Sequence, residues 1–152
     1  MKVYFCLTWA RSPVKLSQAF KHFGLGQSFK MYQSRINAYA KCGILPRPQR
    51  GWNSGKLSRV MLCDIGDIKT VRSSECISQC VSKYQTDSVE NLYIVIGGAD
   101  GISEAMRQEY AAAYLWSFGK LTLPHELAAV VAAEQIYRAF TIINHHPYHA
   151  GH

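Results

Sequence analysis

Hydrophobic residues along this chain fall into two kinds of segment, continuous apolar runs and runs with apolar residues three or four positions apart. The continuous runs at residues 2–9, 59–64 and 91–96 are rich in β-branched and aromatic residues, and they predict strands. The spaced runs predict helices at residues 16–42 (interrupted at 24–26), 68–84, 104–115 and 125–142. Strands that alternate with helices predict an α/β fold with a layered sheet.

Turn and cap residues divide these segments. Ser103 is placed to cap the helix that follows it, and Pro124 suits the first turn of the next one. The stretch 43–55 contains prolines, glycines and basic residues, so it predicts an exposed loop. Residues 120–123 predict a short strand or an extended loop, and Gly66 predicts a turn after the second strand.

A glycine-rich segment at residues 97–101, called the glycine loop here, joins the strand at 91–96 to the next helix. Glycine allows positive φ and a close approach of the backbone to a ligand, and ligands of open α/β sheets bind at strand ends. The spacing is not that of a dinucleotide fingerprint, which disfavours a nicotinamide-binding domain. The loop therefore predicts either a tight turn or a ligand cradle.

The chain has 152 residues, of which 48% are hydrophobic and 18% charged, as expected for one folded domain. Its apolar runs are shorter than the roughly 20 residues that a membrane helix needs, and its start does not resemble a signal peptide. The five cysteines are scattered and odd in number, which favours free thiols in a reducing compartment. Zinc at Cys76 and Cys80 is disfavoured because no second ligand pair stands nearby. These features predict a cytoplasmic protein.

The formal net charge is +7, and most of the excess lies before residue 90. Such an asymmetry predicts a basic half that faces a nucleic acid, although a basic solvated surface has the same composition.

Three further segments have a plain structural explanation when each is taken alone. His125 suits a cap, Glu134 and Arg138 suit an i,i+4 ion pair, and the tail at 144–149 suits a segment that closes over a site. Metal binding by the histidines of the tail is disfavoured, since a short extended segment does not supply four tetrahedral ligands.

Taken together and in order, four blocks resemble the ribosomal RNA large subunit methyltransferase H family, whose members are small SPOUT-class enzymes. The blocks are residues 95–101, 121–125, 133–139 and 147–149, and the span that contains them is roughly two fifths of the chain. The resemblance implies a single domain over 1–152 with a SPOUT-type layered sheet. It also implies a C-terminal deep trefoil knot in the cofactor-binding part at 91–152.

The resemblance also implies the chemistry. The expected reaction is methyl transfer from S-adenosylmethionine to N3 of a pseudouridine in large-subunit rRNA, on the assembled ribosome. The expected assembly is a homodimer whose cofactor sites lie against the partner subunit, and neither a metal nor a membrane is expected to take part.

Site residues follow from the same resemblance. The residues expected to bind the cofactor are Cys63, Gly98, Gly119, Lys120, Leu121, Thr122, Leu123 and Pro124. The residues expected to handle the substrate are Glu134, Arg138, Tyr148 and His149. Among these, His149 is a candidate base or proton relay, Arg138 a candidate partner for a carbonyl oxygen or an RNA phosphate, and Glu134 the residue that orients Arg138.

The N-terminal part at 1–90 departs from the family pattern. Leu7 to Arg11 stand where the family has a small turn after its first strand, and the span up to the strand at 59–64 is shortened. Two alternatives therefore stay open. One is a SPOUT methyltransferase that acts on another RNA, such as transfer RNA, and the other is a non-catalytic RNA-binding or ribosome-assembly module.

Overall fold

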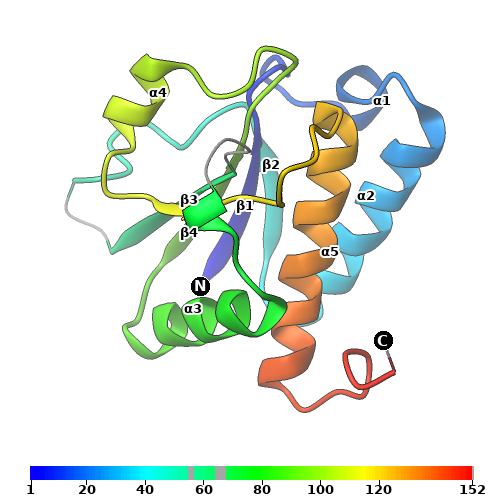
Figure 1. The fold of residues 1–152 in the computed structure, drawn as a ribbon, viewed down its shortest axis with the longest axis vertical. Helices are drawn as coiled ribbons and strands as arrows, with labels where there is room; N and C mark the ends of the chain where they lie inside the picture. The colour runs from blue at the N-terminus through cyan, green and yellow to red at the C-terminus, as the bar shows by residue number, and fades with distance from the viewer. Residues whose placement is uncertain (55–56, 64–67, 152) are drawn as a thin grey trace.

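Five parallel strands form the sheet, in the order β2-β1-β4-β3-β5 (Figure 1). The computed structural model describes residues 1–54, 57–63 and 68–151. In chain order the strands are β1 (Lys2–Leu7), β2 (Cys42–Leu45), β3 (Ser58–Cys63), β4 (Asn91–Ile96) and β5 (Tyr114–Trp116). The helices are α1 (Leu16–Ala19), α2 (Phe23–Ile36), the short 3₁₀ helix η1 (Ile68–Thr70), α3 (Ser74–Thr86), α4 (Glu104–Glu109) and α5 (His125–Ile143).

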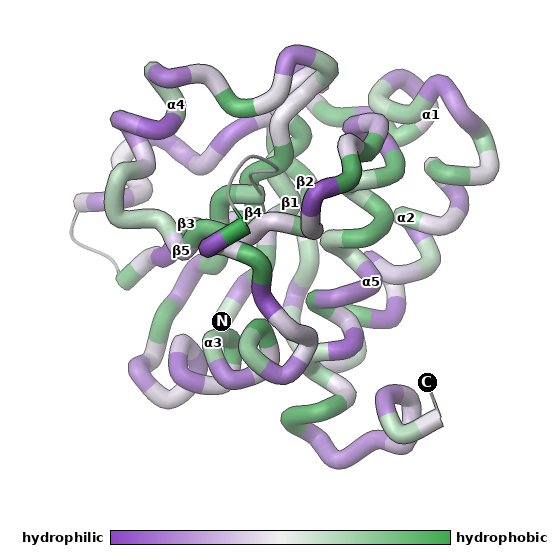
Figure 2. Tube along the Cα trace, viewed as in Figure 1, coloured by the Kyte–Doolittle hydropathy of each residue, from purple (hydrophilic) through white to green (hydrophobic). Residues whose placement is uncertain are grey.

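Alternate residues of the central strands point into two separate cores, one on each face of the sheet. The larger core packs Phe5, Ile94 and their neighbours against α2, α3 and α5. The smaller core packs Tyr93 and Val95 against α4 and the segment around Trp52. The central strands are covered on both faces, which explains why they are continuous apolar runs, and Figure 2 shows them as mostly hydrophobic.

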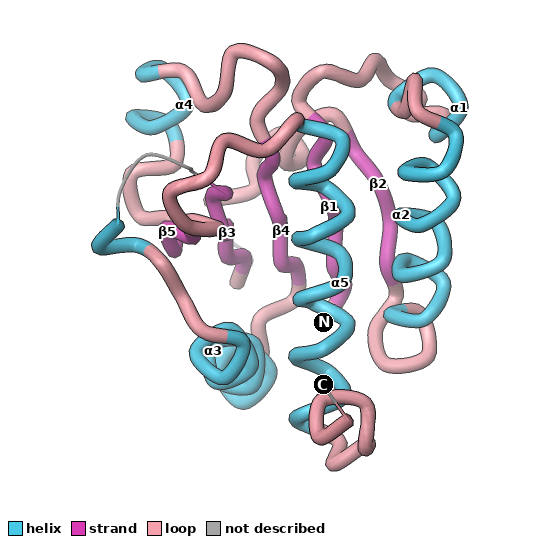
Figure 3. The backbone as a smooth tube through the Cα atoms, turned by 45° about the vertical axis from the view of Figure 1, so that its right-hand side comes forward, coloured by secondary structure: helices cyan, strands magenta, loops and turns pink. Residues whose placement is uncertain are grey.

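Small side chains let α5 lie close to its neighbours. Its buried alanines are Ala128, Ala129, Ala132, Ala133 and Ala139. The helix packs along both α2 and α3, and it runs from the carboxyl ends of the strands towards their amino ends (Figure 3).

Several predictions from the sequence are confirmed. Strands lie at residues 2–7, 58–63 and 91–96, each within one residue of the predicted start, and a helix fills 125–142. The hydroxyl of Ser103 accepts a hydrogen bond from the amide of Met106 and so caps α4. Residues 120–123 form an extended loop. The turn expected at Gly66 lies outside the described residues, and the knot stays a prediction.

Two predictions in the N-terminal half are wrong. The helical run is broken before Phe23, where His22 caps α2 by accepting from the amide of Leu25, and not at residues 24–26. The stretch 43–55 is a loop only after Leu45, because residues 42–45 add the edge strand β2 to β1.

Two helices end earlier or start later than predicted. The segment 68–84 is interrupted at residues 71–73, since Ser73 caps α3 by accepting from the amide of Cys76. The helix predicted at 104–115 ends at Glu109, because the following Tyr110 packs against Trp52 and residues 114–116 pair with β3. Within the described residues, no helix is long and apolar enough to cross a membrane.

Candidate functional site

A narrow pocket lies at the carboxyl ends of β3 and β4, next to the start of α5. It measures about 40 Å³ and is lined by Cys63, Ile96, Gly97, Gly98, Gly101, Ile102, Phe118, Leu123 and Ala128. Three of the predicted cofactor residues, Cys63, Gly98 and Leu123, therefore come together from three distant segments. Burial raises the pKa of the Cys63 thiol far above its usual range, so this wall of the pocket is neutral.

The glycine loop is folded tightly on itself. The Gly101 amide donates to the carbonyl oxygen of Gly98 at 2.9 Å, and Gly101 has a φ of +73°. A Cβ at Gly97 would lie 2.6 Å from the carbonyl carbon of Gly101, which leaves no room for any side chain there. The glycine loop is thus a tight turn, as one interpretation of its sequence predicted. It also lines a pocket, so the second interpretation, a ligand cradle, stays open.

The other predicted cofactor residues lie on the loop at 119–124 that leads into α5. Lys120, Leu121, Thr122 and Pro124 are exposed, and only Leu123 of this loop lines the pocket. The loop begins at Gly119, which has a φ of +108° and donates its amide to the hydroxyl of Ser117 at 3.2 Å. In this conformation Leu123 forms part of the pocket wall, while its neighbours Thr122 and Pro124 are exposed.

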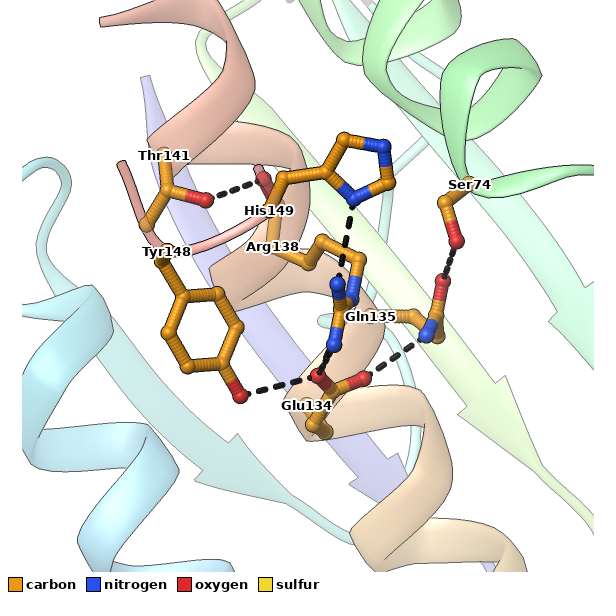
Figure 4. A network of polar contacts seen from close by, with 7 residues as sticks. All are labelled: Ser74, Glu134, Gln135, Arg138, Thr141, Tyr148 and His149. Atoms are coloured by element: carbon orange, nitrogen blue, oxygen red, sulfur yellow. Dashed lines mark hydrogen bonds and ion pairs between the residues drawn. The ribbon is translucent and has the colours of Figure 1, made fainter. Parts of the chain in front are cut away.

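A polar cluster built on Glu134 lies farther along α5 (Figure 4). One carboxylate oxygen, Oε1, accepts from Arg138 at 2.6 and 3.0 Å and from the hydroxyl of Tyr148 at 3.0 Å. The other, Oε2, accepts from the amide of Gln135 at 2.7 Å. The side chains of Arg138 and Glu134 are only 12% and 17% exposed, so this pair is far less hydrated than an ordinary surface ion pair.

The C-terminal tail completes the cluster. The guanidinium of Arg138 lies 4.9 Å above the ring centre of Tyr148, and the phenol of Tyr148 has its pKa raised by burial and by its bonds to Glu134 and Tyr32. Tyr148 therefore stays protonated and donates to the carboxylate. The structure brings together all four residues that were predicted to handle the substrate, namely Glu134, Arg138, Tyr148 and His149.

The two ring nitrogens of His149 have different partners, and these partners define its tautomer. Nδ1 lies 3.1 Å from Nη1 of Arg138, and Nε2 lies 2.9 Å from Oε1 of Glu75. Because a guanidinium can only donate, Nδ1 must accept, and the ring proton must sit on Nε2, where it is donated to the carboxylate. The pKa of Glu75 is lowered, by its backbone hydrogen bond and by the bond to His149.

We expect nitrogen-15 spectra of the histidines to show His149 as the Nε2–H tautomer near neutral pH. Replacing Glu75 with alanine removes the acceptor, so the Nε2 proton should exchange with water several-fold faster. Glu104→Ala is the matched control, because it also removes an acidic residue from the first turn of a helix capped by serine. A wild-type spectrum dominated by the Nδ1–H tautomer would contradict the arrangement.

Sequence reasoning missed the residues that support the cluster from α3. Glu75 binds His149, and the hydroxyl of Ser74 donates to Gln135 at 2.6 Å, which in turn donates to Glu134. Because the predicted helix ran unbroken from 68 to 84, these residues fell in its middle and not at its start. The capping serine at position 73 was the signal that could have placed them at a helix terminus.

The pocket and the cluster lie at different levels of α5, since Ala128 near its start lines the pocket whereas Glu134 and Arg138 lie farther along. At a rise of about 1.5 Å per residue, Glu134 lies about 14 Å and Arg138 about 20 Å along the axis from His125. The two parts of the predicted site are therefore well separated within one chain.

Comparison with known proteins identifies the family of the chain. The model of the family described as "Predicted SPOUT methyltransferase" matches residues 53–149, which include both the pocket and the cluster. A "Ribosomal RNA large subunit methyltransferase H" from Beijerinckia indica is 45% identical over 76 residues, or 50% of this chain and 46% of the relative. Proteins of the same name from Bartonella bacilliformis and Methylococcus capsulatus are 42% and 49% identical over 92 and 59 residues.

These matches cover 60% and 39% of this chain, and 55% and 37% of those two relatives. The chain thus spans about half the length of the curated relatives that it matches. The resemblance expected from the four sequence blocks is confirmed, and with the family model matched over most of its length the chain belongs to the SPOUT methyltransferase family.

Proposed function

We propose that this chain is an S-adenosylmethionine-dependent RNA methyltransferase that modifies N3 of a pseudouridine in large-subunit rRNA, on the assembled ribosome. The observation that carries the proposal is the cluster of Glu134, Arg138, Tyr148 and His149. This cluster supplies a cation and an imidazole to one point, and methylation of a weakly acidic ring nitrogen needs both. The curated relatives bear the name of an rRNA methyltransferase.

The lining of the pocket fits an adenosine-containing cofactor in chemistry. Its walls are apolar, its thiol is neutral, and its glycine loop admits close approach of a ligand to the backbone. Small-molecule sites measure about 300–1,000 Å³, so the loop at 119–124 must move outward to enlarge the pocket of about 40 Å³. When bound, S-adenosylmethionine supplies an electrophilic methyl group. Leu121 then covers its apolar surface, and Gly119 provides the hinge of the loop.

Each residue of the cluster has its own role in removing the N3 proton and in stabilising the charge that results. Arg138 turns its Nη1 from His149 to a carbonyl oxygen of the uracil ring, where negative charge develops as N3 loses its proton. This turn frees the lone pair of His149 Nδ1, which accepts that proton, while Glu75 stabilises the imidazolium through Nε2. Glu134 keeps the rest of the guanidinium in place through its bonds to Arg138.

Because the pocket and the cluster are well separated within one chain, we propose that a second copy completes each site. In a two-fold dimer, the cluster of one protomer would face the pocket of its partner. Exposed apolar side chains that lie close in sequence to the pocket residues support this arrangement. They are Ile68, Val71 and Leu121, whose exposed fractions are 62%, 44% and 74%. The deep trefoil knot and a cytoplasmic location belong to the same proposal.

Two alternatives differ in their substrate or in their activity. A SPOUT enzyme that acts on transfer RNA would keep the pocket and the cluster and would differ in its basic N-terminal half. A non-catalytic RNA-binding module would not need the buried pair of Glu134 and Arg138, since an unused ion pair of this kind gains little over apolar residues.

Titration calorimetry with S-adenosylhomocysteine tests the cofactor half of the proposal. We expect one molecule to bind per chain, followed in activity assays by transfer of labelled methyl groups to large-subunit rRNA. A folded protein that does not bind S-adenosylhomocysteine would contradict both methyltransferase hypotheses, the one with rRNA and the one with transfer RNA as substrate. Binding with transfer only to transfer RNA would select the first alternative, and binding without transfer to any RNA would select the second.

A further inference from the structure

A second pocket lies at the carboxyl end of β1, outside the cofactor pocket and the polar cluster. It measures about 230 Å³ and is lined by Trp9, Ala10, Arg11, Lys15, Gln18 and Ala19. Its two charged residues, Arg11 and Lys15, are both cationic and exposed. The pocket lies before residue 53, where the match to the family model begins.

The topology of the sheet favours a ligand at this place. From β1 the chain continues to β2 on one side, and from β4 it continues to β5 on the other side. The connecting helices also lie on opposite faces, since α2 packs in the larger core and α4 in the smaller one. The carboxyl ends of β1 and β4 therefore form the crevice in which open parallel sheets bind their ligands.

The pocket adjoins the cofactor pocket directly. The hydroxyl of Thr8 donates to the carbonyl oxygen of Ile96 at 2.8 Å, immediately before the glycine loop. A Cβ on Gly98 would lie 3.3 Å from the Cβ of Trp9, and the ring centre of Trp9 lies 4.5 Å from that of His125 at the start of α5. Trp9 thus links the two pockets, and Figure 3 shows the carboxyl end of β1, α1 and the start of α5 at the same end of the molecule.

The charge of the surrounding sequence points to a polyanion. The first 63 residues contain 11 of the 17 lysines and arginines and none of the 10 acidic residues. Arg11 and Lys15 therefore have no carboxylate in the whole N-terminal segment that could neutralise them. Guanidinium and ammonium groups that flank a pocket are the groups with which proteins bind phosphodiesters.

We infer that the pocket of Trp9, Arg11 and Lys15 binds the phosphodiester backbone of the RNA strand whose nucleotide is methylated beside the cofactor pocket. Arg11 and Lys15 bind phosphate oxygens, and Trp9 forms the wall between the backbone and the reacting nucleotide. The inference rests on the proposed function, because it assumes an RNA substrate. It assigns the position of the strand to a part of the chain that the family pattern does not describe.

The test measures how binding of a fluorescein-labelled single-stranded RNA of mixed sequence depends on salt. Phosphate contacts are independent of sequence, so this probe reports them. Between about 50 and 200 mM salt, each neutralised phosphate of a single strand adds about 0.7 to the slope of log affinity against log salt. The double variant Arg11→Ala/Lys15→Ala should therefore lower the slope by about 1.4.

The matched control is Lys2→Ala/Lys41→Ala, which removes the same formal charge from the amino ends of β1 and β2, at the opposite edge of the sheet. It should leave the slope unchanged, and Arg11→Lys/Lys15→Arg should retain the wild-type slope. All altered residues are exposed, so circular dichroism should show the wild-type fold for each variant.

If both double alanine variants lowered the slope of log affinity against log salt equally, the inference would be overturned. RNA binding would then depend on the net charge of the protein and not on the position of Arg11 and Lys15. An effect confined to binding of inorganic phosphate, with an unchanged RNA slope, would overturn the assignment to RNA. The proposed function fails in a different way, because it requires binding of S-adenosylhomocysteine, which neither double variant should change.

Discussion

Replacing Arg138 with alanine is expected to reduce methyl transfer to large-subunit rRNA by about 10²–10³-fold, as does the loss of one preorganised donor at a developing anion. The guanidinium is held by Glu134, stacked on Tyr148 and bonded to His149, so its loss removes the centre of the cluster. The rate is measured as transfer of labelled methyl groups to ribosomal subunits. Calorimetry with S-adenosylhomocysteine should show unchanged cofactor affinity.

Lys83→Ala is the matched control for this variant. It also breaks an i,i+4 ion pair, between Lys83 of α3 and Asp87 at the C-cap of that helix, but this pair is exposed and lies outside the cluster. Arg138→Lys should restore only part of the rate, because an ammonium group cannot bind Glu134 and a substrate oxygen with one rigid fork. Full activity of Arg138→Ala would remove the cluster from the mechanism.

Replacing Gly97 with alanine is expected to abolish cofactor binding and to destabilise the fold. The added Cβ would meet the carbonyl group of Gly101 at 2.6 to 2.7 Å, and this neighbour is backbone that cannot rotate away. Overpacking of this kind costs about 1–3 kcal/mol. At about 2–4 °C per kcal/mol for a domain of this size, the melting temperature should be lowered by about 2–12 °C.

Gly151→Ala provides the comparison, since a Cβ there has its nearest neighbour at 3.9 Å, in ordinary contact. It should change neither the melting temperature nor the affinity for S-adenosylhomocysteine. A Gly97→Ala protein that binds the cofactor product like the wild type would show that the glycine loop does not form the cofactor site.

A mixture of the Arg138→Ala and Gly97→Ala proteins tests whether the two protomers of a dimer share their sites. Arg138→Ala damages the cluster and Gly97→Ala damages the pocket, so a mixed dimer contains one intact site if partners share their sites. Random pairing of equal amounts should restore about a quarter of the wild-type rate, because half of the dimers have one intact site of two. No recovery from two folded variants that exchange subunits would contradict sites shared between protomers.

The central part of the fold was predictable because strands that are buried on both faces have continuous apolar sequences. The strands β1, β3 and β4 are continuous apolar runs, and α5 combines an alanine-rich face with a proline at its start. The edge strand β2 was missed because it has only four residues, contains Gly43 and is followed by a proline. The early end of α4 was missed because it depends on Tyr110 packing against Trp52, a contact that spans nearly 60 residues of sequence.

Contacts within α5 were predictable from the sequence, whereas contacts between distant segments and the position of the loop at 119–124 were not. Glu134 and Arg138 share a helix face, so their contact follows from spacing alone. The bond between Glu75 and His149 joins residues 74 positions apart, and no local pattern carries that information. The exposure of Lys120, Leu121 and Thr122 was not predictable either, because a loop of this composition is compatible with both an open and a closed position.

The length of α5 sets the distance between the pocket at its start and the polar cluster farther along it. One inserted residue between His125 and Glu134 would rotate the cluster by about 100° about the helix axis and shift it by about 1.5 Å. Glu134 would then no longer meet Ser74 through Gln135, and the tail would lose its anchor on α3. Insertions and deletions within this helix would therefore separate the cluster from its partners on α3. In evolutionary terms, we expect the length of this helix to vary less than the N-terminal segment that precedes the family match.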